Sequence, residues 1–189
     1  MLARQVVRVS ITVLCCLGLW GWMAPARVTQ GVELAGADRA ARSDQVRIAR
    51  VIGAANWRLD SETRVRIARA VLRCRTRQAL DPDLVLAVLL VESSARPEAR
   101  SSMGAIGLMQ VMPHMFEELG LPGNPAHIEM NVEAGCLLLA DNIRRLGEER
   151  GISAYFWGGS IRGDSYLRRV RTVMGGLARG TSRRTSTDG

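Results

Sequence analysis

The chain has 189 residues and a formal net charge of +8, with 26 basic side chains against 18 acidic ones. Every basic side chain is an arginine, so the chain offers no lysine for a Walker-A phosphate loop or for Schiff-base chemistry. Its two histidines, His114 and His127, fit no common zinc spacing, and we expect no metal site. Aromatic residues make up only 4% of the chain, too few for a nucleic-acid stacking surface, so no nucleic-acid partner is expected.

Residues 1–26 are predicted to direct export. Arg4 and Arg8 precede an uncharged run from Val9 to Ala26, and its end, Ala24-Pro25-Ala26, fits a signal-peptide cleavage site. An uncleaved membrane anchor is the alternative, because the uncharged run approaches the length that spans a bilayer. Either way we expect an exported protein, periplasmic or associated with the cell envelope, and a membrane partner only if the segment stays uncleaved.

The rest of the chain is predicted to be all-α. Residues 27–42 are expected to be a linker and residues 43–78 a pair of helices, the second N-capped by Ser61 and ending near Gln78. A row of arginines repeats every three or four positions on that second helix, and both a solvated face and a surface for an anionic polymer or membrane fit it. Its members are Arg66, Arg69, Arg73 and Arg77. Residues 179–189 are predicted to be a disordered tail.

Two cysteines, Cys74 and Cys136, lie outside the leader. In an oxidising compartment an even pair of cysteines favours a disulfide. Two separate buried thiols on helices are the alternative, and two cysteines are too few for a metal site.

Asp81-Pro82 marks the start of a further helix, as an N-cap followed by proline at the first helical position. The run Leu84–Val91 is apolar on every side, so the helix must be enclosed by protein; a buried strand is the alternative. Glu92 follows at the last turn. Burial and the negative end of the helix dipole both raise the pKa of a carboxyl group, which favours an acid that donates a proton near neutral pH. A helix-terminal glutamate that turns out to water is the alternative, and the more common case when these residues are considered alone.

The segment from Glu92 to Pro113 resembles the lytic transglycosylase (SLT) domain of the lysozyme superfamily. The positions in register with the family pattern are Glu92-Ser93, Pro97, Ala99, Ser101, Gly104-Ala105, Gly107-Leu108-Met109-Gln110 and Pro113. Two later segments are also similar to family motifs, Asn131-Val-Glu-Ala-Gly135 and Ala154-Tyr155 with Gly158. The resemblance covers residues 79–171 and implies a mainly helical, lysozyme-like domain at residues 79–178.

The resemblance implies a set of site residues. Glu92 is the expected catalytic residue, and Tyr155 is expected to orient it or to stabilise its charged form. The expected substrate-binding residues are Ser93, Gly107, Met109, Gln110 and Tyr155. From the residues alone, core filling by Met109 and a loop hydrogen bond from Gln110 are the alternatives. The chain departs from the family at Phe156, where asparagine is usual, and at Leu138, where tyrosine is common.

The implied activity is cleavage of the bond between N-acetylmuramic acid and N-acetylglucosamine in peptidoglycan glycan strands, without water or a cofactor. Glu92 acts first as the acid and then as the base, and the product carries a 1,6-anhydro end. A lysozyme-type hydrolase and a non-catalytic glycan-binding component of an envelope assembly remain alternatives. Small members of the family often serve a secretion or conjugation apparatus, which the resemblance offers as a further partner.

Overall fold

We analysed a computed structural model, which describes residues 26–185. The predicted export segment therefore lies outside the described residues except for Ala26. The chain divides into two compact units, residues 1–39 and residues 40–189. Of the first unit only residues 26–39 are described, and all of them are helical.

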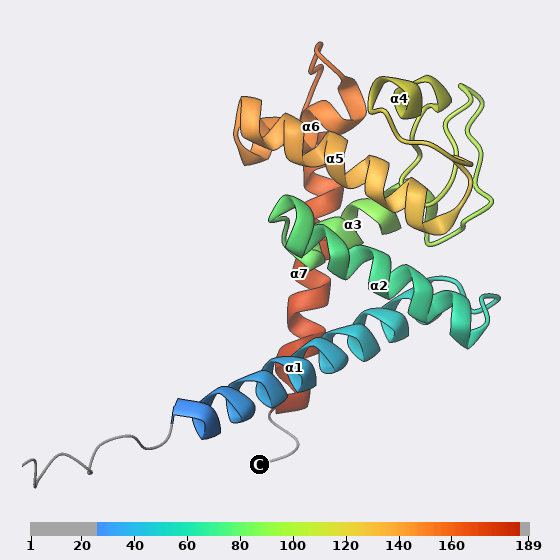
Figure 1. The fold of residues 1–189 in the computed structure, drawn as a ribbon. Coiled ribbons are helices and arrows are strands. Elements are labelled where there is room, and N and C mark those ends of the chain that lie inside the picture. The colour runs from blue at the N-terminus through green and yellow to red at the C-terminus, as the bar shows by residue number, and fades with distance from the viewer. Residues whose placement is uncertain (1–25, 186–189) are drawn as a thin grey trace, which may run out of the picture. The chain divides into compact units, whose positions relative to one another are not determined.

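Residues 26–185 form seven helices (Figure 1), and within this range the only β contacts are isolated bridges between α3 and α4. The all-α prediction is confirmed, and residues 84–91 are helical rather than a strand. No helix within residues 26–185 combines the length and the apolar character that crossing a bilayer requires. The helices are α1 (Ala26–Ala55), α2 (Ser61–Gln78), α3 (Pro82–Ser93), α4 (Pro113–Glu118), α5 (Ile128–Leu146), α6 (Glu148–Trp157) and α7 (Ser165–Thr185).

Two segments are more helical than the sequence predicted. Residues 27–42, expected to be a linker, belong to α1, and residues 179–185, expected to be disordered, belong to α7. Neither helix contains a proline, and both are rich in alanine or arginine, which favour helix. The remaining tail residues, 186–189, lie outside the described range.

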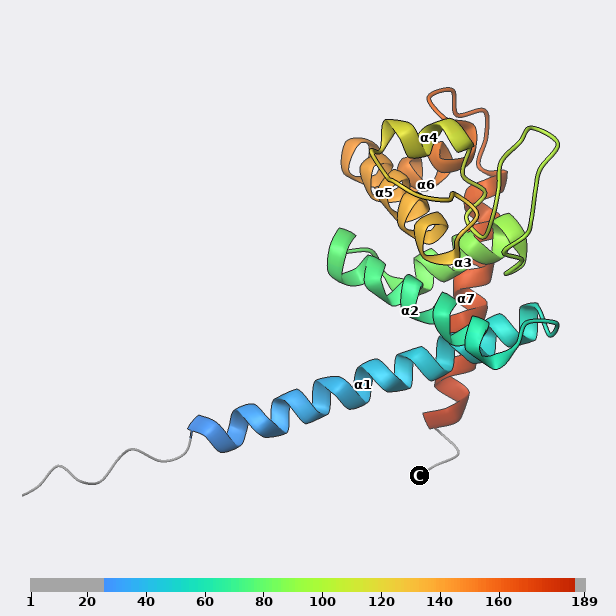
Figure 2. The ribbon, with the colours of Figure 1, turned by 45° about the vertical axis from the view of Figure 1, so that its right-hand side comes forward.

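The core of the larger unit surrounds α3. This helix packs against α2 and α7, while α5 packs on α2 and α6 (Figures 1 and 2). Every residue from Leu84 to Leu89 is buried, as expected for a helix with no polar face. Ile48 and Ile52 of α1 and Val71 of α2 are also fully buried. The apolar run of α3 thus holds Glu92 at a fixed place at the end of the core.

The start of α2 differs by one residue from the prediction. Asp60, not Ser61, is the N-cap, with extended backbone angles and a carboxylate that accepts a hydrogen bond from the Thr63 amide at 2.7 Å. Aspartate at this position satisfies a free amide and also complements the positive end of the helix dipole. At α3 the predicted cap is confirmed: Asp81 is the N-cap and Pro82 opens the helix.

The arginine row of α2 contacts the neighbouring helices. Arg66 pairs with Glu129 of α5 at 3.0 Å, and Arg77 pairs with Glu133 of the same helix at 3.1 Å. The Arg66–Glu129 pair is exposed and contributes little to stability, whereas in the second pair the Glu133 side chain is largely shielded. The sequence was compatible with a solvated face or with a surface for an anionic polymer or membrane. The structure shows that Arg66 and Arg77 pair with acidic side chains of the same domain.

A disulfide joins α2 to α5. Cys74 and Cys136 form the bond, with their Cα atoms 6.0 Å apart. Both side chains are fully buried in the core. The bridge closes a loop with a sequence separation of 62 residues, and loop-closure entropy alone gives a stabilisation of roughly 4 kcal/mol for a loop of this length.

Candidate active site

Glu92 lies at the last turn of α3, half-buried. The chain leaves the helix directly after it, because Ser94 and Ala95 both adopt left-handed backbone angles, with φ of 53° and 59°. Residues other than glycine or asparagine adopt this conformation at a cost, so surrounding contacts must hold it. One such contact is the hydrogen bond from Asn56 Nδ2 to the Ala95 carbonyl oxygen at 3.0 Å.

The hydroxyl of Tyr166 donates a hydrogen bond to Glu92 Oε1 at 2.6 Å. Tyr166 belongs to α7 and is 2% exposed. Burial raises the pKa of Glu92, and this effect is opposed by the Tyr166 hydrogen bond and by the positive charge of Arg169. Burial and the neighbouring Glu92 carboxyl raise the pKa of Tyr166, so its hydroxyl stays protonated and remains a donor.

Tyr155 was expected to orient Glu92 or to stabilise its charged form, but its hydrogen bond goes to another residue. Its hydroxyl donates to the Met109 carbonyl oxygen at 2.9 Å instead. Burial, and secondarily the charge of Glu92, raise the pKa of Tyr155. Tyr155 is therefore near enough to Glu92 to sense its charge, but its hydrogen bond holds the loop before α4. Tyr166 was not predicted from the sequence, because it lies outside the segments that resemble the family motifs.

Phe156, one of the two departures from the family pattern, covers Tyr166. The two rings are stacked, with centroids 5.0 Å apart and an interplanar angle of 14°. Phe156 is 53% exposed, so its outer face remains open to solvent. The other departure, Leu138, is partly buried against the core. An apolar ring thus lies beside the tyrosine that contacts Glu92.

The loop between α3 and α4 is held mainly by Asn131, a buried residue at the start of α5. Its Oδ1 accepts a hydrogen bond from the Met109 amide at 2.8 Å, and its Nδ2 donates to the carbonyl oxygens of Ile106 and Pro125 at 2.9 and 3.1 Å. Asn131 belongs to one of the segments that are similar to family motifs, but the sequence did not predict a role for it. A buried amide must find partners, and here they come from the loop backbone.

Two glycines make these contacts possible. Gly107 has φ of 76°, and a Cβ at this position would lie 2.5 Å from the Asn131 side chain. At Gly135 on α5, a Cβ would lie 2.6 Å from Met109 Cβ. Only residues without a side chain permit so close an approach.

Most of the predicted substrate contacts hold the loop or fill the core in this structure. Met109 is fully buried, and Ser93 is 1% exposed, its hydroxyl bonded to the Leu89 carbonyl oxygen. Gln110 Nε2 donates to the Ala99 and Gly107 carbonyl oxygens at 3.2 and 2.9 Å. The side chains of Met109 and Ser93 are thus enclosed, and that of Gln110 is engaged with backbone.

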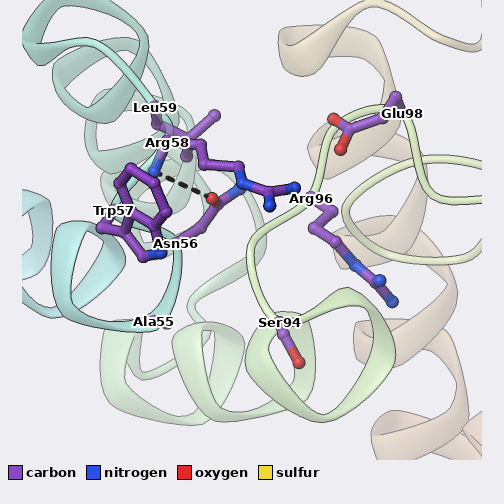
Figure 3. A pocket seen from close by; sticks show the side chains of 8 residues that line it. All are labelled: Ala55, Asn56, Trp57, Arg58, Leu59, Ser94, Arg96 and Glu98. Atoms are coloured by element: carbon purple, nitrogen blue, oxygen red, sulfur yellow. Dashed lines mark hydrogen bonds between the residues drawn. The ribbon is translucent and has the colours of Figure 1, made fainter.

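A pocket of about 450 Å³ lies beside the segment that follows Glu92. Figure 3 shows its two sides, the loop from α1 to α2 with Trp57 and Arg58, and the segment with Ser94, Arg96 and Glu98. A second pocket of about 310 Å³ is bordered by Glu98, Arg100 and Gly107. Among the described residues, no three histidine, cysteine or acidic side chains gather as metal ligands would.

Comparison with known proteins places this geometry in context. The sequence model of the transglycosylase SLT domain matches residues 70–170. The transglycosylase of Enterobacteria phage PRD1 is 38% identical over 81 residues, 43% of this chain and 30% of the phage protein. The membrane-bound lytic murein transglycosylase C of Actinobacillus pleuropneumoniae serotype 5b (strain L20) is 35% identical over 80 residues, 37% of this chain and 22% of that protein.

These aligned parts are less than a third of either relative. Among solved structures, the 70 kDa soluble lytic transglycosylase from Escherichia coli aligns with a TM-score of 0.43 and 23% identity. That alignment covers 71% of this chain and 25% of the other.

Proposed function

This chain belongs to the transglycosylase SLT domain family, and from that premise we propose that it is a peptidoglycan lytic transglycosylase. The observation that carries the proposal is the environment of Glu92. It is a half-buried carboxyl group with a raised pKa and one protein hydrogen-bond donor, Tyr166. Such a group remains protonated at a higher pH than an exposed glutamate, as a general acid requires.

Glu92 performs both proton transfers in the proposed mechanism. The protonated carboxyl group gives its proton to the glycosidic oxygen, which leaves with N-acetylglucosamine as the bond to C1 of N-acetylmuramic acid breaks. The C6 hydroxyl of the same muramoyl residue then forms a bond to C1, and Glu92 takes its proton. The carboxyl group ends protonated, as it began, and the product carries a 1,6-anhydro ring.

Tyr166 supports both steps. Its hydroxyl fixes the orientation of the carboxyl group and stabilises the carboxylate that exists between the two proton transfers. Arg169 adds a positive charge that favours the same carboxylate. The aromatic ring of Phe156, stacked on Tyr166, limits the access of water to this hydrogen bond from one side. Tyr155 acts on the loop through Met109.

We propose that the protein works in the cell envelope, where its substrate lies. The export segment at residues 1–26 supports this place of action, and a relative named as membrane-bound is consistent with it. N-terminal sequencing of the exported protein distinguishes a cleaved signal, with a new terminus near Arg27, from a full-length membrane anchor. Association with a secretion or conjugation apparatus stays a prediction.

Product analysis tests the proposed activity. Purified sacculi digested with the full chain should release muropeptides with anhydro ends, each lighter by one water molecule than a lysozyme product. Products with reducing ends would instead support the alternative of a lysozyme-type hydrolase. Binding to sacculi without any turnover would favour the glycan-binding alternative.

A further inference from the structure

The pocket beside the segment that follows Glu92 is formed by two stretches of chain that are far apart in the sequence but joined by a hydrogen bond. Asn56, in the loop from α1 to α2, donates to the Ala95 carbonyl oxygen at 3.0 Å. Ser94, which lines the pocket, follows Glu92 by two residues. The loop that carries Asn56 lies outside the part of the chain that matches the family model, residues 70–170. This side of the pocket is therefore built by residues that the family model does not match.

The pocket carries two arginines with no carboxylate partner among the described residues. Arg96 uses its Nε to donate to the Ser93 carbonyl oxygen at 2.9 Å, and its terminal nitrogens make no ion pair within residues 26–185. The Arg58 guanidinium lies 5.5 Å from the centroid of the Trp57 ring. Arg66 of α2, by contrast, is satisfied by Glu129. The guanidinium groups of the pocket thus remain open to an anionic ligand.

The other side chains of the pocket point to a ligand that is not a simple polyanion. Glu98 lies on the same side of the pocket as Arg96 (Figure 3) and adds a negative charge to the lining. Trp57 is 75% exposed and offers a flat apolar face. A volume of about 450 Å³ is within the range that binds small organic ligands. The combination matches a ligand with carboxylates, an amine and apolar groups.

We propose that this pocket binds the peptide stem carried by a peptidoglycan strand while Glu92 acts on the glycan. The inference rests on the proposed function, because it assigns the stem peptide to a pocket whose lining begins two residues after Glu92 in the chain. Arg58 and Arg96 pair with the carboxylates of the stem, and Glu98 pairs with its amine. Trp57 covers the aliphatic part of the peptide. The protein therefore prefers peptide-bearing strands over naked ones.

A comparison of two substrates tests this preference in the full chain. The wild-type ratio of kcat/KM for peptide-bearing strands over amidase-stripped strands should exceed one. Arg58→Gln should lower that ratio by about tenfold to a hundredfold, the scale of one hydrogen bond to a charged group. Arg150→Gln is the matched control, since Arg150 is exposed on α6 and does not line the pocket. A ratio that stays the same in Arg58→Gln overturns the stem-peptide site while leaving the proposed activity standing.

Calorimetric titration with soluble disaccharide–tetrapeptide and with the peptide-free disaccharide makes the test independent of turnover. It uses the Glu92→Gln chain, with and without Arg58→Gln. Tighter binding of the peptide-bearing ligand, lost with Arg58→Gln, supports the site even if sacculi are not cleaved. Equal binding of the two ligands by the Glu92→Gln chain overturns it. Trp57→Ala is a second variant with no side-chain hydrogen bond to lose, and it should weaken the peptide-bearing ligand alone.

Discussion

The helix pair α3–α7 and the loop between α3 and α4 differ in how their candidate functional residues are held. On the helices, Glu92 and Tyr166 meet through one hydrogen bond across a sequence separation of 74 residues, and each is fixed by the packing of its own helix. In the loop, the side chain of Gln110 bonds to the loop backbone, and Asn131 reaches into the loop from α5. The helices thus hold the proposed catalytic group, while the motif residues of the loop bond to the loop backbone in this structure.

The largest effect is expected from Glu92→Gln. The amide keeps the size of the side chain and an oxygen for the Tyr166 hydroxyl, but it cannot transfer a proton. General acid–base assistance accounts for about 10² to 10⁴ in rate, and in the proposed mechanism Glu92 supplies it in both steps, so the release of anhydro products should fall by at least that factor. Wild-type turnover by this variant would remove Glu92 from the mechanism.

The same variant should not lose stability. Burial raises the pKa of Glu92, so the folded state binds the proton more tightly than the unfolded state does. Stability contributed by this group is present at low pH and is lost as the pH rises through the raised pKa. Glutamine is neutral throughout, so thermal unfolding near neutral pH should occur at the same temperature as in the wild type or higher. A lower melting temperature would contradict this account of the Glu92 environment.

Tyr166→Phe should have the next largest effect, a fall in kcat/KM of roughly tenfold to a hundredfold, from the ~1–3 kcal/mol of a buried hydrogen bond to an ionising group. Its hydroxyl lowers the pKa of Glu92, so its removal should shift the alkaline limb of the pH profile to higher pH. Tyr155→Phe is the control, because its hydroxyl bonds to Met109, and it should leave that limb in place. A shift in the control instead would restore the orienting role to Tyr155.

Asn131→Ala removes the side chain through which α5 holds the loop between α3 and α4. It removes three hydrogen bonds and leaves the buried Met109 amide without a partner, which should lower the free energy of unfolding by about 2–3 kcal/mol. Asn142→Ala on the same helix removes only an exposed contact with Arg145 and should change stability little. Chemical denaturation measures both. Equal losses in the two variants would mean that the Asn131 contacts do not hold the loop.

The smallest effect is expected at Gln110. Gln110→Ala removes two backbone contacts and keeps a residue with φ of 49°, so a loss of about 1 kcal/mol in stability and less than tenfold in kcat/KM is expected. Gln110→Gly relieves the backbone strain and should be closer to the wild type in stability. If the two variants lose the same large factor in kcat/KM with unchanged stability, Gln110 contacts substrate as the sequence predicted.

The sequence predicted the helix that carries Glu92 because its signals are local. Asp81-Pro82 marks the start of α3, and the apolar run requires enclosure, so the buried position of Glu92 follows from a few neighbouring residues. Tyr166 could not be predicted in the same way. Its contact with Glu92 depends on how α7 packs against α3, and a tyrosine on an arginine-rich helix has no local pattern that reveals its partner.

Met109 and Gln110 were identified by their match to the family pattern, and in the structure they fill the core or bond to the loop backbone. Pattern matching locates Met109 and Gln110 but does not distinguish a residue that touches the ligand from a residue that shapes the loop. The distinction depends on burial and on positive φ angles, which the three-dimensional structure shows and the local sequence pattern does not. Helix lengths were underestimated at both ends of the chain, since polar composition alone does not exclude helix.

The bond between Cys74 and Cys136 has a consequence for proteolysis. The two cysteines enclose Glu92, the whole loop before α4 and Asn131 in one covalent ring, whereas Tyr166 lies outside it. A protease that cuts the loop once therefore opens the ring without separating the chain. The nicked protein migrates as a single species on a gel until reductant is added, and only then do two fragments appear.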